Sequence, residues 1–157
     1  MDPRAVAHVL DEVATLLELQ GRGTAPEFRT SARAISALQG ADLAALAAGG
    51  GLSRVRGLTE GPRAVVEDLL ATGDSELRDR LREETPEGLF EMLRLPGLGP
   101  ARIHQLHDGL GIESVQELEE AARDGRLATL PRLLPVVRSL PVPVVFDNMG
   151  GLRADTD

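Results

Sequence analysis

The chain has 157 residues, 42% of them hydrophobic, which is enough for one substantial domain or two small ones with a core. Only 2% are aromatic, with no Trp or Tyr, which argues against the base-stacking platforms of RNA-binding and single-strand-binding proteins. The net charge of −8 argues against a protein that coats itself in nucleic acid, and the absence of cysteine excludes disulfides and cysteine metal sites.

Two amphipathic helices are predicted at the start of the chain. Residues 3–20 place apolar residues at helical spacing, with Asp2 as the expected N-cap. Thr24 and Glu27 have the spacing of a capping box ahead of a second helix. A third, short helix is expected over residues 42–47. The buried face of the second helix is expected to contain Phe28, Ala32 and Ile35.

Residues 52–73 have the outline of two helices joined by a turn that contains Gly57 and Gly61. A charged helix over residues 74–84 should follow, anchored by Leu77 and Leu81. Acids outnumber arginines by nine to three over residues 67–91, so this helix should present a solvated acidic face.

The stretch from Leu93 to Leu110 reads LRLPGLGPARIHQLHDGL. Gly97 and Gly99 suit a tight hairpin, where the backbone takes φ values costly for other residues or comes close to a ligand. Pro100 fits the first turn of the next helix, where its missing N–H loses nothing. The sequence therefore predicts two short helices joined by a hairpin.

This second hairpin is also a predicted anion site. The N–H groups of Gly97, Gly99, Ala101 and Arg102 can point outward together at the positive end of the next helix. No acid occurs from Met92 to His107, and Arg94 and Arg102 flank the turn. These features favour phosphate binding, and the alternative is a plain packing joint between two helices.

Beyond the hairpin, Ser114 and Glu117 form a second capping box ahead of a helix that ends at Gly125. Residues 131–140 predict one more short helix. Residues 141–146 are β-prone, but we find no partner strand for them and expect residues 150–157 to be a disordered tail.

Five segments resemble, in order and spacing, the amino-terminal part of bacterial family X DNA polymerases. They read VAHVLDEVATLLEL, FRTSARAI, LSRVRGLTEGPRAVVEDLLATG, PEGLFEMLRLPGLGPARIHQLHDGLGI and SVQELEEAARDGRLATLP. The resemblance implies an all-α fold with two helix-hairpin-helix units. We expect a lyase-like domain with a degenerate first hairpin over 1–73, a second subdomain over 74–131, and a terminal segment over 132–157.

The resemblance also implies that the hairpins grip DNA and hold a monovalent cation, Na⁺ or K⁺, through backbone carbonyls. The carbonyls would be those of Leu93, Leu95 and Leu98. At the first hairpin, Arg56 and Thr59 replace the proline and glycine of the second, and Glu60 would repel a phosphate, so DNA contact and a retained packing role both stay open there. Its candidate DNA contacts are Gly57, Gly61, Arg56 and Arg63.

Two departures from the family predict that the chain is not an enzyme. The lyase members use a lysine in the helix after the first hairpin, where Val65 stands here, and the chain contains no lysine at all. The polymerase palm, with its metal-binding carboxylates, is not present in the sequence.

The leading hypothesis is therefore non-catalytic, sequence-independent DNA binding linked to repair or replication, with gapped, nicked or duplex DNA and another repair protein as candidate partners. The alternatives are a protein-interaction scaffold that has lost DNA binding, or an enzyme fragment whose palm another chain supplies. We expect no cofactor beyond the cation, no membrane segment and a cytoplasmic location; the sequence leaves the oligomeric state open.

Overall fold

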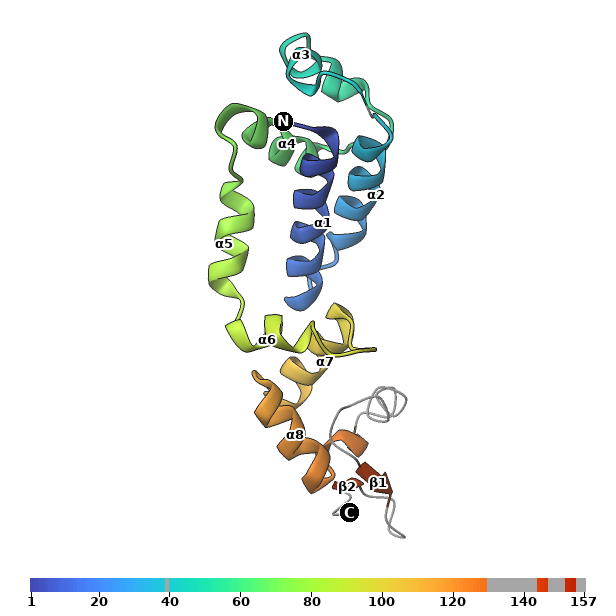
Figure 1. Cartoon of the computed structure of the whole chain (residues 1–157), viewed down its shortest axis with the longest axis vertical. Coiled ribbons are helices and arrows are strands. Elements are labelled where there is room, and N and C mark those ends of the chain that lie inside the picture. Colours follow the sequence, from blue (N-terminus) through green and yellow to red (C-terminus); the bar gives the residue numbers. More distant parts are fainter. Residues whose placement is uncertain (39, 130–143, 147–151, 155–157) are drawn as a thin grey trace. The chain divides into compact units, whose positions relative to one another are not determined.

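The computed structural model describes residues 1–38, 40–129, 144–146 and 152–154 and shows a helical fold (Figure 1). The all-α prediction is confirmed. The chain divides into two compact units, Met1–Thr85 and Pro86–Asp157. This division lies later than the predicted boundary at Gly73, and the packing of the helix between the two positions explains the difference.

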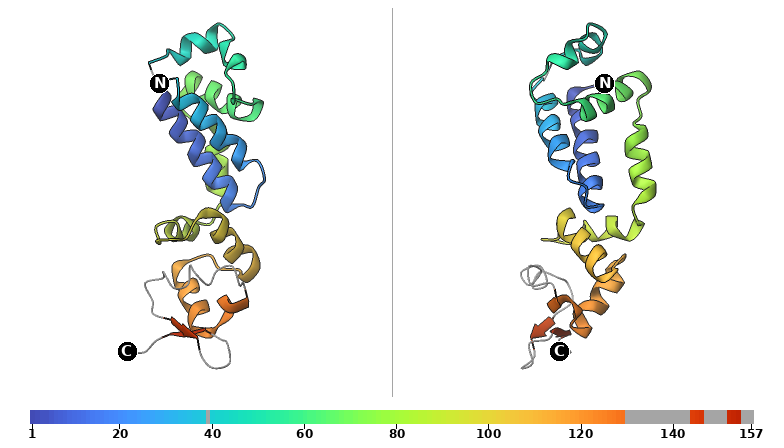
Figure 2. Two further views of the ribbon diagram at one scale, coloured as in Figure 1. Left: turned by 90° about the vertical axis from the view of Figure 1, so that its right-hand side faces the viewer. Right: turned by 180° about the vertical axis from the view of Figure 1, so that it is seen from behind.

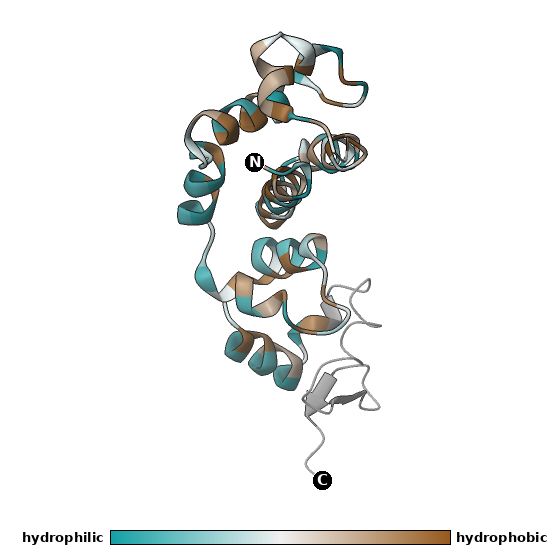
Figure 3. Cartoon of the chain, turned by 45° about the horizontal axis from the view of Figure 1, so that its top comes forward, coloured by the Kyte–Doolittle hydropathy of each residue, from teal (hydrophilic) through white to brown (hydrophobic). Residues whose placement is uncertain are grey.

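The first unit is built on two long helices, α1 (Pro3–Leu19) and α2 (Ala25–Ser36), which lie side by side in every view (Figures 1 and 2). Each has an apolar and a polar side (Figure 3). The predicted stripe of Phe28, Ala32 and Ile35 is buried, as the helical spacing indicated. The unit continues with α3 (Leu43–Ala48), the 3₁₀ helix η1 (Gly51–Arg54), α4 (Glu60–Thr72) and α5 (Glu76–Glu84).

Helix α5 is held against α1 by hydrogen bonds that are partly or fully buried. The Gln20 side chain donates to the Leu81 carbonyl and to the Thr85 hydroxyl, both at 3.1 Å. Thr85, only 5% exposed, donates in turn to the Leu81 carbonyl at 2.7 Å. These bonds join α5 to the first unit, whereas the expected second subdomain began at residue 74.

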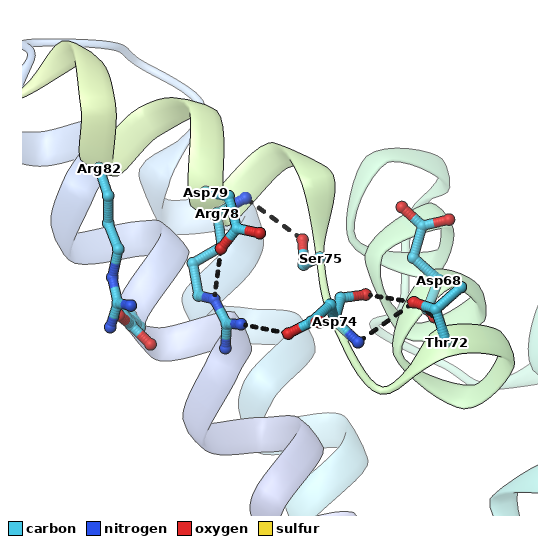
Figure 4. Close-up of polar contacts among 8 residues, drawn as sticks. Asp68, Thr72, Asp74, Ser75, Arg78, Asp79 and Arg82 are labelled. Atoms are coloured by element: carbon cyan, nitrogen blue, oxygen red, sulfur yellow. Dashed lines mark hydrogen bonds and ion pairs between the residues drawn. The ribbon is translucent and has the colours of Figure 1, made fainter.

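A polar corner joins α4 to α5 (Figure 4). The chain leaves α4 through Gly73 at φ 80°, and the Thr72 hydroxyl accepts a hydrogen bond from the Asp74 N–H at 3.1 Å. Ser75 then caps α5 by accepting from the Arg78 N–H at 3.2 Å. The sharp change of direction therefore satisfies backbone donors that a helix end leaves unpaired.

The second unit contains α6 (Glu87–Met92), α7 (Pro100–Leu110), α8 (Val115–Asp124) and the 3₁₀ helix η2 (Arg126–Thr129). Strand β1 (Val144–Phe146) pairs antiparallel with β2 (Leu152–Ala154), Val145 lying opposite Arg153. The prediction of a strand without a partner was therefore wrong, and residues 152–154 do not belong to a disordered tail. The predicted helix over 131–140 lies outside the described residues.

The three predicted N-caps have different outcomes. At α8 the Ser114 hydroxyl accepts from the Glu117 N–H at 3.1 Å, while the Glu117 carboxylate accepts from the Glu113 N–H at 2.7 Å. Asp2 and Thr24 occupy N-cap positions, but neither side chain makes a capping hydrogen bond. At Thr24 the backbone is already helical, with ψ near −4°, whereas a capping residue is normally extended.

In the part of the chain that the structure describes, no helix is both long and apolar enough to cross a membrane.

Candidate nucleic-acid interface

The second hairpin is a tight turn between α6 and α7. The Leu95 N–H donates to the Met92 carbonyl at 3.0 Å, and the Leu98 N–H donates to the Leu95 carbonyl at 3.3 Å. Gly97 has φ 77°. Proline followed by a residue with positive φ is the pattern of a type II β-turn, which Pro96 and Gly97 supply here.

Four exposed residues of the turn and of the start of α7 have backbone N–H groups without an acceptor among the described residues. The first bond of α7 runs from the Ile103 N–H to the Gly99 carbonyl at 3.0 Å. Among the described residues, no acceptor is found for the N–H groups of the four residues predicted to bind an anion, all of which are exposed: Gly97, Gly99, Ala101 and Arg102. The structure thus brings the predicted donors together at the positive end of the α7 dipole.

Two positive side chains accompany these donors. Arg94 and Arg102 are both exposed, and neither forms an ion pair with any described residue. An arginine whose charge is not already compensated by a carboxylate is available to a phosphate oxygen. Because no acid occurs from Met92 to His107, neither charge is compensated within the hairpin itself.

The opposite side of the hairpin is anchored in the core of the second unit. Leu98, Ile103 and Leu106 are each at most 4% exposed. Gly88 in α6 approaches the segment before α8 so closely that a Cβ there would lie 1.8 Å from the Glu113 carbonyl oxygen. This packing fixes α6 and α7, so the loop between them is held at both ends.

The first hairpin repeats the second bond for bond. Its N–H groups at Val55, Leu58 and Arg63 donate to the carbonyls of Leu52, Val55 and Thr59 at 3.2, 3.2 and 2.9 Å. Each donor and acceptor stands forty positions before its counterpart in the second hairpin. Gly57, at φ 91°, matches Gly97. The forty-residue offset between the two hairpins is present in the sequence, but only the outline of the first hairpin, over residues 52–73, was predicted from it.

Charge distinguishes the first hairpin from the second. Arg54 and Arg56 are exposed and make no ion pair with a described residue, but Arg63 lies 3.9 Å from the Glu67 carboxylate. Glu60 is exposed in the first turn of α4, near Gly61. The predicted contacts at Gly57, Gly61, Arg56 and Arg63 are thus grouped around one turn, with an acid among them.

Arg29 and Val65, both in the first unit, are engaged elsewhere. Arg29 points to α1, where it lies 2.8 Å from the Glu18 carboxylate and 3.5 Å from that of Asp11, so its charge is already compensated. Val65, at the position of the family's lyase lysine, is 3% exposed in the core of the first unit. A buried valine supplies no nucleophile.

This chain is similar to a helix-hairpin-helix family and to a known protein. A family model described as a SAM-like helix-hairpin-helix tandem matches residues 89–133. The chain is 30% identical over 132 residues to the DNA polymerase/3'-5' exonuclease PolX of Bacillus subtilis (strain 168). That match covers 83% of this chain but 22% of the other protein, in its amino-terminal part.

The match to the family model extends to residue 133 and so includes a second segment similar to the hairpin turn. Leu130, Pro131, Arg132 and Leu133 repeat the order of Leu95 to Leu98, with arginine in place of Gly97. Together, the matched segments, the repeated turns and the helical fold agree. The chain is related to the amino-terminal, helix-hairpin-helix-bearing part of bacterial family X DNA polymerases.

Proposed function

We propose that this chain binds DNA through its phosphate backbone, without reading base sequence, and that the second hairpin makes the main contact. The observation that carries the proposal is the group of four exposed N–H groups at Gly97, Gly99, Ala101 and Arg102, none of which has an acceptor among the described residues. The relationship to family X polymerases supports a role in repair or replication.

The chemistry of this group suits a phosphate oxygen. Neutral amides at a helix start offer several hydrogen bonds and a favourable dipole to one anion, and the guanidinium groups of Arg94 and Arg102 add charge beside them. Contacts of this kind fix the position of a protein on DNA but carry no base information. Because the chain as a whole has a net charge of −8, binding should be modest and should weaken steeply with salt.

Fluorescence anisotropy with duplex, nicked and gapped DNA at two salt concentrations tests the proposal. The double variant Gly97→Val/Gly99→Val should lose binding, because a valine side chain strains the positive-φ backbone at position 97 and covers the donors at position 99. Gly111→Val is the matched control, since Gly111 also has positive φ, at 68°, but lies at the far end of α7. Equal binding by the wild type and both variants would contradict the proposal.

The flanking arginines allow a second, quantitative check. Replacing Arg94 or Arg102 with Gln should lower the slope of log K against log salt by about one each, because one phosphate contact is lost. Arg123→Gln, which removes an exposed arginine from α8 in the same unit, should leave that slope unchanged.

We also propose that the Leu93, Leu95 and Leu98 carbonyls hold Na⁺ or K⁺. These three oxygens suit a monovalent cation because they are neutral. The Leu95 carbonyl uses one lone pair for the Leu98 N–H and keeps another for the cation. A bound cation would add a positive charge beside the phosphate. Exchanging K⁺ for choline at constant ionic strength should lower the melting temperature of the free protein, whereas an unchanged melting temperature would argue against the site.

The proposed role is non-catalytic. Because Val65 is buried and the chain contains no lysine, it should not cleave abasic DNA faster than buffer does. A protein-interaction scaffold is the second candidate, favoured by the exposed Glu60 at the first hairpin and by the net charge. Absence of DNA binding at low salt by the wild-type chain would decide for the scaffold.

A further inference from the structure

A buried serine reaches the first hairpin from another helix. Ser31, in α2, has no exposed surface, and its hydroxyl donates to the Gly57 carbonyl at 3.0 Å. A serine inside a helix commonly bonds a carbonyl of its own preceding turn. Here Ser31 instead bonds a carbonyl outside its own helix, in the turn of the first hairpin, which repeats the hydrogen bonds of the second hairpin.

The bond fixes one peptide unit of that turn from both sides. The Gly57 carbonyl is held by Ser31, while the N–H of the same peptide, on Leu58, donates to the Val55 carbonyl at 3.2 Å. The N–H groups of Gly57 and Thr59, on either side of this peptide, have no acceptor among the described residues. Holding this peptide therefore restricts the directions that both neighbouring donors can take.

The turn also lies directly on the face of α2 that carries Ser31. A Cβ at Gly57 would lie 3.3 Å from the Ala34 Cβ and 3.8 Å from the Thr30 Cγ2. Thr30 and Ala34 are four residues apart on one face of α2, so together with Ser31 they form the surface against which the hairpin packs.

The two hairpins differ in what makes the turn rigid. At the second, Pro96 fixes φ at the position before Gly97. At the first, Arg56 stands at that position and leaves φ free to vary. Among the described residues, no side chain bonds the Gly97 carbonyl as Ser31 bonds that of Gly57.

We propose that Ser31 is a positioning residue: it replaces the missing proline and holds the first hairpin in a conformation that binds a second DNA phosphate. This inference rests on the proposed DNA binding. It implies that the hydrogen bond from Ser31, which lies outside the hairpin motif, holds the degenerate first hairpin in the conformation that binds phosphate.

The test compares Ser31→Ala with Thr85→Val in the full chain, using ¹⁵N-labelled protein titrated with a short duplex well below the melting temperature. Both variants remove a buried hydroxyl from the first unit, but the Thr85 hydroxyl bonds Gln20, at the end of α1, and the Leu81 carbonyl in α5, away from the first hairpin. Ser31→Ala should reduce DNA-induced shifts at the Gly57 and Thr59 amides and weaken binding about fivefold, because ordering the turn on DNA would then cost the free energy of about one hydrogen bond. Thr85→Val should preserve both.

A rescue variant separates positioning from stability. Arg56→Pro loses no backbone hydrogen bond, because the Arg56 N–H donates to no backbone acceptor among the described residues. Val55 before it has φ −72° and ψ 117°, which suits a residue preceding proline. In the Ser31→Ala background, Arg56→Pro should restore the shifts at the Gly57 and Thr59 amides more than Arg56→Gln does. Failure of the proline to restore them would overturn the inference.

The other outcomes are also distinct. Wild-type protein that binds no DNA would overturn the proposed function and this inference with it. Wild-type binding with shifts at residues 97–102 but none at Gly57 or Thr59, or equal behaviour of Ser31→Ala and Thr85→Val, would overturn the role of Ser31 alone.

Discussion

Three glycines of the second unit differ in what the structure demands of them. Gly97 has φ 77°, a conformation that side chains make costly. Gly88 leaves no room for a Cβ, which would lie 1.8 Å from the Glu113 carbonyl oxygen. Gly99 has φ −84°, which suits any residue, and nothing lies within 4 Å of a Cβ built there. The fold therefore does not demand glycine at position 99, and the open space there is consistent with the proposed phosphate contact.

Gly88→Ala should therefore destabilise the second unit. The added methyl group meets backbone rather than a flexible side chain, so α6 must shift away from Glu113 at a cost of about 3 kcal/mol. Chemical denaturation followed by circular dichroism measures the loss. A stability within about 0.5 kcal/mol of the wild type would contradict the close packing described for α6.

Gly99→Ala should have the opposite effect. Its methyl group enters open space, so the free energy of unfolding should change by no more than about 0.5 kcal/mol. DNA affinity should nevertheless fall about fivefold, because the methyl group stands among the donors and obstructs a hydrogen bond. Unchanged anisotropy titrations would mean that no ligand approaches this glycine.

At the scale of the helix, the predicted capping boxes show that residue spacing alone does not decide whether a side-chain cap forms. Ser114 and Thr24 have the same capping-box spacing to an acid, yet only Ser114 makes the bond. Spacing reports which residues could meet, but the backbone angles at the cap decide whether they do. Those angles depend on how the preceding turn leaves α1, which the sequence does not state.

Ser114→Ala should consequently cost about 1 kcal/mol of stability, the usual value for a lost N-cap. Thr24→Ala is the control and should change stability by a few tenths of a kcal/mol at most, because no capping bond exists to be lost. Thermal melts of the two variants make the comparison, and equal losses would show that the cap at α8 contributes nothing special.

The sequence predicted helix positions and buried faces well because apolar spacing reports both directly. The second hairpin was predicted residue by residue, since Pro96 and Pro100 restrict the backbone locally and Gly97 permits the positive φ that the turn needs. Long-range pairings were not predicted: the β1–β2 pair, the attachment of α5 through Gln20 and the bond from Ser31 to Gly57 all join residues whose meeting no local pattern encodes.

At the scale of the molecule, the chain consists of two units, each carrying one hairpin. The first has a core of its own, formed mainly by α1 and α2 and closed by the bonds of Gln20 to α5. A fragment of residues 1–85 should therefore fold alone, with a helical circular dichroism spectrum and a cooperative melt. A fragment that is unfolded at low temperature would show that α5 and α1 need the rest of the chain.

Charge is arranged unevenly over the whole chain. The acids concentrate in residues 67–91, whereas the second hairpin has no acid from Met92 to His107. An acidic protein can therefore still present one local surface that attracts phosphate, while its net charge limits adhesion to DNA elsewhere. Affinity should accordingly depend on the hairpins and salt more than on the length of DNA offered.

A ¹⁵N–¹H titration of the intact chain with a short duplex at low salt tests the contact between the second hairpin and phosphate most directly. If the hairpin binds phosphate, the amide signals of Gly97, Gly99, Ala101 and Arg102 should shift most, and the shifts should reverse when salt is added. Shifts confined to the acidic helix α5, or no shifts in the hairpin at a DNA concentration that saturates binding, would contradict it.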